Sequence, residues 1–149
     1  MGQLTNLGKQ KENAIIYQGA TPPANFFLQL FTNAVVPDAD TVSDGELTEI
    51  PTGNGYTAGG ITVARNTTDF PTNTKDDALD ESIATMADKV IGASGGPLPA
   101  SGDPIFYGLM TEPGTVGSRD VWAFFTFGST TVTDGNDLTI ASLGIKRSQ

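Results

Sequence analysis

Three apolar runs, the first two rich in aromatic residues, define the fold of this chain, and they read Ile105–Phe106–Tyr107–Gly108–Leu109–Met110, Val121–Trp122–Ala123–Phe124–Phe125–Thr126–Phe127 and Asp137–Leu138–Thr139–Ile140. Gly, Pro, Asp and Asn lie between the runs, a pattern typical of short antiparallel strands joined by turns. The segment 133–137 contains Asp-Gly, which favours a hairpin-like turn because glycine adopts positive φ at little cost. The runs contain no catalytic motif, so they indicate a protein that presents a surface.

Shorter segments upstream extend the β pattern. Strands are predicted at 26–31, 47–50 and 61–65, whereas 82–91 is ambiguous between helix and strand. The chain shows no internal repeat of 20–50 residues. Six to eight short strands favour a mainly all-β fold, an antiparallel β-sandwich or jelly-roll-like domain over residues 21–149 with one or two short helices.

The first 20 residues differ from this domain. Residues 1–20 are predicted to form an N-terminal arm or a short helix, spanning about 9–17 because Gly8 and Gly19 limit it. The Pro22–Pro23 pair stops such a helix, since proline lacks a backbone donor and restricts the residue before it.

Composition excludes several chemistries. The 149 residues suit one domain and include neither Cys nor His. Disulfides, thiolate nucleophiles, Cys/His zinc sites and triads with an imidazole base are therefore ruled out. We expect a protein that is not an enzyme and has no cofactor.

Charge is distributed unevenly. The net charge is −9, and residues 13–145 hold four basic and sixteen acidic residues, a net of −12. Such a body repels nucleic acid phosphates, so we expect no nucleic-acid partner. No apolar run approaches the ~20 residues of a membrane helix, so no membrane partner is expected either. The basic ends, with Lys9, Lys11, Lys146 and Arg147, either meet an acidic partner or are simply solvated.

Two acidic clusters were considered as sites. Asp38, Asp40 and Asp44 are weak calcium candidates, because they depart from the EF-hand spacing and a solvated acidic loop is the simpler interpretation. The second cluster consists of Asp76, Asp77, Asp80 and Glu81. Its carboxylates either form a pair for acid–base chemistry or lie at the solvated start of a helical turn.

An ordered set of segments resembles a known family. Its parts are Phe27–Leu28–Gln29–Leu30–Phe31–Thr32–Asn33, Gly55–Tyr56–Thr57, Phe106–Tyr107–Gly108–Leu109, Val121–Trp122–Ala123–Phe124, and Val132 to Ile140. In order and approximate spacing they resemble small β-rich virion proteins of tailed bacteriophages, of the head-decoration or tail-accessory type. The resemblance covers about residues 26–145.

This resemblance implies virion structure. We expect a capsid decoration or cement protein, a homotrimer that binds across neighbouring subunits of the major capsid protein or to other virion proteins. It would be assembled in the bacterial host cytoplasm and reside in the virion. The alternatives are a tail or fibre module that binds a host receptor or glycan, and a head–tail connector component.

Interface residues are predicted in two segments and on one strand face. The arm contributes Leu4, Leu7, Ile15 and Ile16, and the long 92–104 loop contributes Pro97, Leu98 and Pro99. Strand alternation predicts that Trp122 shares a face with Phe124, and that one face of this strand is core and the other an interface.

Overall fold

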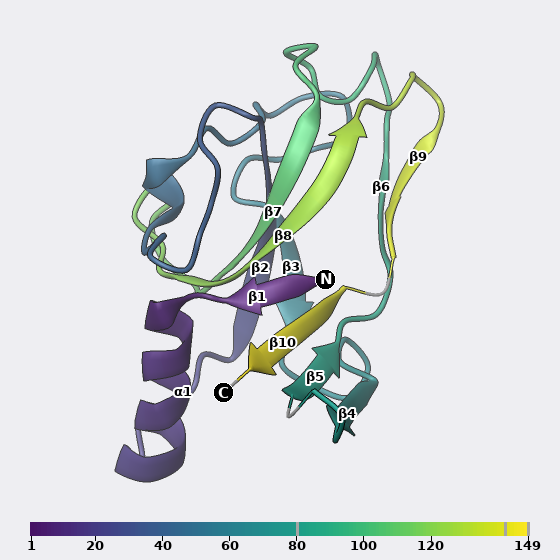
Figure 1. Cartoon of the computed structure of the whole chain (residues 1–149). Coiled ribbons are helices and arrows are strands. Elements are labelled where there is room, and N and C mark those ends of the chain that lie inside the picture. Colours follow the sequence, from purple (N-terminus) through teal and green to yellow (C-terminus); the bar gives the residue numbers. More distant parts are fainter. Residues whose placement is uncertain (80, 142, 149) are drawn as a thin grey trace.

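The computed structural model describes residues 1–79, 81–141 and 143–148, and it is mainly β, as predicted (Figure 1). The described residues form one α-helix, α1 (Asn6–Gln18), and a short 3-10 turn, η1 (Asp44–Glu46). The strands are β1 (Gly2–Leu4), β2 (Asn25–Phe31), β3 (Ile61–Ala64), β4 (Thr72–Asp76), β5 (Glu81–Thr85), β6 (Lys89–Gly92), β7 (Ile105–Thr111), β8 (Val121–Thr130), β9 (Asp137–Ile140) and β10 (Gly144–Ser148). No helix among the described residues is long and apolar enough to cross a membrane.

Eight strands form one strongly curled sheet with the order β3-β2-β7-β8-β1-β10-β5-β4, which resembles half of a barrel (Figure 1). β6 and β9 form a separate two-stranded sheet. This arrangement is not clearly the sandwich or jelly roll that the sequence predicts, and the large sheet is mixed instead of antiparallel. The reason is β1, which pairs antiparallel to β8 but parallel to β10.

Both faces of the central strands are covered. The larger core cluster includes Leu28, Trp122 and Phe125, while Phe31, Leu109 and Val121 belong to a second cluster. Leu47, which follows η1, also belongs to the second cluster. The β2–β3 connection therefore buries a sheet face that the sequence assigns to an interface.

A β-bulge changes which face Trp122 occupies. Met110 pairs with Ala123 and Thr111 with Val121, so Trp122 is the extra residue in β8. Trp122 consequently packs in the larger cluster with Ala123, whereas Phe124 contacts the second cluster. The prediction that Trp122 and Phe124 share a face is wrong for this reason.

The helix begins earlier than predicted because Thr5 caps it. The Thr5 Oγ1 accepts a hydrogen bond from the Gly8 N–H, and Gly8 is buried within the first turns of α1 instead of limiting it. The helix ends as predicted at Gly19, which is left-handed with φ 70°.

Several local predictions are confirmed and two are wrong. Strands at 26–31, 61–65, 105–110, 121–127 and 137–140 are present, and 82–91 divides between β5 and β6. The 47–50 segment forms only an isolated bridge through Glu49, and the described residues 76–79 and 81 belong to the β4–β5 hairpin instead of a helical turn. The turn at 133–137 is present, but β9 pairs with β6.

We predict that Gly8→Ala destabilises the protein. A Cβ at Gly8 would meet the backbone oxygen of Trp122, which cannot easily move. This overlap outweighs the gain in helix propensity, so we expect a net loss of about 1–2 kcal/mol in the free energy of unfolding, measured in urea.

The matched control is Gly128→Ala in β8, because a Cβ there meets no atom within 4 Å. Its unfolding free energy should stay within about 0.5 kcal/mol of the wild type. Equal stability of the two variants would contradict the close approach of α1 to β8.

Candidate functional site

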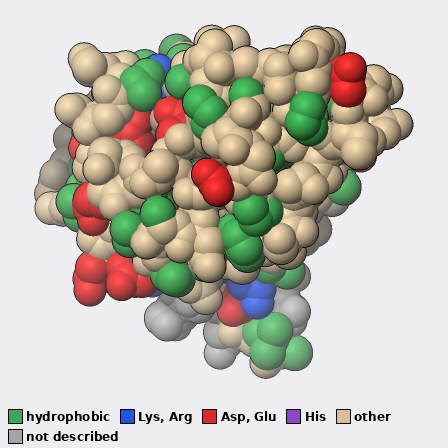
Figure 2. All heavy atoms as spheres, turned by 90° about the horizontal axis from the view of Figure 1, so that it is seen from above, with side chains coloured by type: hydrophobic (Ala, Val, Ile, Leu, Met, Phe, Trp, Pro, Cys, Tyr) green, Lys and Arg blue, Asp and Glu red, His purple; other side chains and the backbone are tan. Residues whose placement is uncertain are grey.

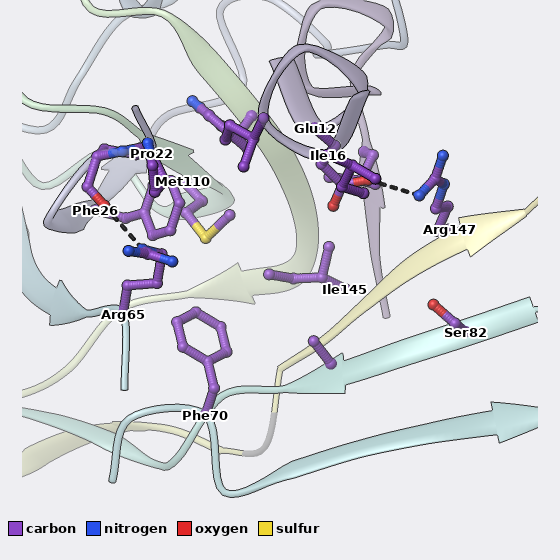
Figure 3. A pocket seen from close by; sticks show the side chains of 15 residues that line it. Glu12, Ile16, Pro22, Phe26, Arg65, Phe70, Ser82, Met110, Ile145 and Arg147 are labelled. Carbon is purple, nitrogen blue, oxygen red and sulfur yellow. Dashed lines mark hydrogen bonds and ion pairs between the residues drawn. The ribbon is translucent and has the colours of Figure 1, made fainter. Parts of the chain in front are cut away.

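A mainly apolar hollow lies between α1 and the inner face of the curled sheet (Figure 3). We call it the α1 groove; it has a volume of about 320 Å³ and opens to solvent. It is lined by Leu4, Glu12, Ile15, Ile16, Pro22, Pro23, Phe26, Arg65, Phe70, Ser82, Ala84, Met110, Trp122, Ile145 and Arg147. Eleven of these fifteen side chains are nonpolar in character, and Glu12, Arg65, Ser82 and Arg147 are the exceptions.

The floor of the groove is rigid. Phe26 of β2 and Trp122 of β8 pack edge to face, with ring centroids 5.1 Å apart. The Trp122 Nε1–H donates to the Glu112 carboxylate at 3.1 Å, which fixes the indole from outside the groove. The groove is therefore formed before any ligand arrives.

Glu12 and Arg147 form one polar side of the groove (Figure 3). Their charged groups lie 3.5 Å apart, and Arg147 also donates to the Asn13 side chain. The Glu12 Oε2 is buried and has no hydrogen-bond partner. Burial raises the pKa of Glu12, and the nearby Arg147 guanidinium opposes that rise.

Arg65 lies on the other side of the groove in this view (Figure 3). Its Nε donates to the Pro23 carbonyl at 3.0 Å, and no described carboxylate forms an ion pair with it. Since most cations of this acidic chain are paired, Arg65 is an available positive charge beside an apolar surface.

Asp69 holds the loop that carries Arg65 and Phe70 to the groove. Its carboxylate accepts hydrogen bonds from the Ala64 N–H at 2.6 Å and from the Lys89 ammonium at 2.7 Å. These two contacts tie the loop to β3 and to β6. The Lys89 hydrogen bond, and then the Ala64 N–H, lower the pKa of Asp69.

The predicted arm residues surround this groove in part. Leu4 is 4% exposed and packs in the chain's own core, while Leu7 and Ile15 are half-buried. Ile16 is 58% exposed and lines the groove, and Tyr17 beside it is 78% exposed. The far end of α1 thus presents an apolar surface.

The three interface candidates of the 92–104 loop differ in burial. Pro97 is exposed, whereas Leu98 and Pro99 are buried. Leu98 exchanges backbone hydrogen bonds with Val132, so it joins the 93–104 loop to the segment after β8. Pro97 is the member of this set that is free to meet another molecule.

The three weak metal candidates are not brought together. The Asp44 carboxylate is buried and accepts from the Gln29 amide and from the N–H groups of Gly117 and Arg119. Asp38 and Asp40 are exposed and make local hydrogen bonds. Among the described residues, no group of three acidic side chains could hold a metal ion.

The described residues of the second acidic cluster lie in the β4–β5 hairpin. Asp77 pairs with Lys75 at 2.9 Å, and Glu81 pairs with Lys146 of β10 at 2.7 Å. Asp80 lies outside the described residues. Within the described part, two of these carboxylates are therefore engaged in ion pairs.

Sequence reasoning did not identify the buried polar network around Gln29. The Gln29 amide donates to Asp44 and to Glu49 and accepts from the Thr111 hydroxyl. Glu49 also accepts from the Tyr56 hydroxyl at 2.6 Å, and burial raises the pKa of Tyr56. A glutamine within the apolar run 26–31 was the available signal, since a buried amide needs partners. The network fixes loops, and of its residues Tyr56 alone lines one of the described pockets.

Comparison with protein-family models, curated sequences and solved structures finds no match to this chain.

We predict that Asp44→Asn destabilises the fold. The two oxygens of the Asp44 carboxylate accept hydrogen bonds from three N–H groups. An asparagine side chain at this position has one acceptor oxygen, and its NH₂ group would face one of these N–H donors. The free energy of unfolding should fall by about 1–3 kcal/mol in urea. Asp103→Asn, in the exposed part of the 93–104 loop, is the control and should change little.

We further predict that Asp69→Asn lowers stability at neutral pH but much less in acid. The pKa of Asp69 is lower in the folded than in the unfolded chain, so its contribution is present above the unfolded pKa of about 3.9. It is lost as pH falls through the folded pKa. Urea midpoints of wild type and variant should differ at pH 7 and converge as the pH falls below about 3.5.

Asp134→Asn in an exposed turn is the control for this series. A constant difference between Asp69→Asn and wild type from pH 7 to the acid end would show that the ion pair with Lys89 contributes nothing.

Proposed function

We propose that this chain is a non-enzymatic structural protein of a tailed-phage virion. It acts as a capsid decoration or cement protein, a homotrimer that binds across neighbouring capsid subunits. The observation that carries the proposal is that exposed apolar side chains adjoin each other at two sites of an otherwise acidic module, Ile16–Tyr17 and Val35–Val36. The ordered resemblance of residues 26–145 to phage virion proteins supports the same assignment.

Two apolar surfaces support an assembly role. One is the α1 groove with Ile16 and Tyr17, and the other is the loop after β2, where Val35 and Val36 are 46% and 65% exposed. Apolar side chains rimmed by polar ones are typical of protein–protein interfaces, in which aromatic residues and Arg are enriched.

The loops at one end of the sheet support the proposal that the protein contacts a large partner. β2 and β8 end there and β7 begins there, so loops gather at this end (Figure 1). Figure 2 shows this face: it is mainly uncharged, with scattered hydrophobic and acidic side chains. Pro97 lies in one of these loops and is exposed. We assign this face to the capsid.

Stabilisation by such a protein follows mass action. A module that binds only the assembled lattice adds its binding free energy to the cost of separating neighbouring subunits. The fold suits this role, because side chains pack on both faces of the central strands and hold the loops in place.

The test combines light scattering with capsid binding. We expect purified protein to have the mass of three 15.5 kDa chains. Added to phage particles stripped of it, it should bind at fixed, high copy number and raise the temperature at which the particles release DNA. A protein that ignores capsids and binds host cells would support the tail or fibre alternative instead.

Pro97→Glu sharpens the test of the assigned face. A charge in the contact costs desolvation, so capsid affinity should fall by more than about tenfold with the fold intact. Pro113→Glu, exposed at the opposite end of β7, is the matched control and should bind like the wild type.

A further inference from the structure

We propose that the α1 groove receives the Val35–Val36 loop of a second copy of this chain, so that copies join head to tail into a closed ring. The inference rests on the proposed homo-oligomer and names the contact that forms it. In this contact the α1 groove of one copy and the Val35–Val36 loop of the next form the two sides of one interface.

Hydrogen bonds hold the base of the Val35–Val36 loop in place. Its base is tied to the start of α1, because the Asn6 N–H donates to the Ala39 carbonyl at 2.7 Å and the Asn6 amide donates to the Asp40 carboxylate at 2.7 Å. The Asp38 carboxylate accepts from the Asp40 N–H and closes the turn. The two valines just before this base are exposed.

Loop and groove are complementary in charge. Asp38 and Asp40 are exposed within five residues of the two valines. At the groove, Arg65 has no described carboxylate partner and lies beside the apolar lining of Phe26 and Phe70. Two apolar side chains followed by carboxylates therefore match an apolar groove with a guanidinium at its rim that no described carboxylate pairs with.

The two surfaces lie at opposite ends of β2. Phe26, near the start of this strand, lines the groove, and Phe31 ends the strand just before the loop. Seven residues of extended chain span roughly 20 Å. Because the groove and the loop adjoin opposite ends of this strand, we assign the contact to a second copy.

Such a contact joins two different patches and is heterologous. Heterologous contacts repeat until the rotation closes a ring, which a trimer satisfies. A peptide of the capsid protein is the competing occupant of the groove, and the experiment below separates the two.

The experiment uses two full-length variants that each lack one half of the contact. Val36→Glu impairs the loop but leaves the groove intact, and Ile16→Glu impairs the groove but leaves the loop intact. Both sites are exposed, so both variants should keep the circular dichroism spectrum and melting temperature of the wild type. Val90→Glu on β6, at a site 57% exposed, is the matched control.

Light scattering should show each variant alone as a 15.5 kDa monomer, and Val90→Glu as the wild-type oligomer. A mixture of Val36→Glu and Ile16→Glu should form a dimer that grows no further, because one productive contact remains. Arg65→Gln should weaken wild-type assembly, with a loss that shrinks at high salt.

A mixture that stays monomeric, or variants that assemble like the wild type, would overturn the inference. Capsid binding is measured separately on the same proteins. Wild-type protein that binds capsids although the mixture stays monomeric rejects this contact but leaves the proposed function in place. A dimer in the mixture with no capsid binding by the wild type supports the contact and rejects the decoration role.

Discussion

The structure depends on the anchoring of Thr5. This buried residue caps α1, its hydroxyl donates to the Val121 carbonyl at 2.6 Å, and its N–H donates to the Trp122 carbonyl at 2.9 Å. The same contacts place β1 between β8 and β10, where it joins the two halves of the curled sheet. The first residues of the chain therefore connect the sheet, position the helix and hold the bulged start of β8.

The proposed docking surfaces follow from this anchor. With α1 fixed above the inner face of the sheet, Ile15 and Ile16 face Phe26 and Trp122 across the groove. The Asn6 contacts, one residue after Thr5, also hold the base of the Val35–Val36 loop. One local constraint thus orients both partners of the proposed head-to-tail contact.

Much of the fold could be predicted from the sequence, because the main strands have strong local patterns. The runs at 26–31, 105–110 and 121–127 are strands since they are apolar, β-forming and bounded by turn residues. β1 and β10 were not predicted, because Gly2–Leu4 and Gly144–Ser148 carry no pattern of their own and become strands only by pairing. The groove itself was not predicted: Ile15 and Ile16 were named only as interface candidates of the arm, and Arg65 and Phe70 reach the groove through a loop held by Asp69.

Local composition and short-range periodicity are sufficient to predict the β-rich class, the main strands, the helix stop at Gly19 and the exclusion of Cys and His chemistry. The mixed, curled sheet, the face of Trp122 and the separation of Asp44 from Asp38 and Asp40 arise instead from tertiary contacts. These features depend on which distant segments pair. A one-residue bulge or a parallel neighbour redirects side chains without leaving a mark in the local pattern.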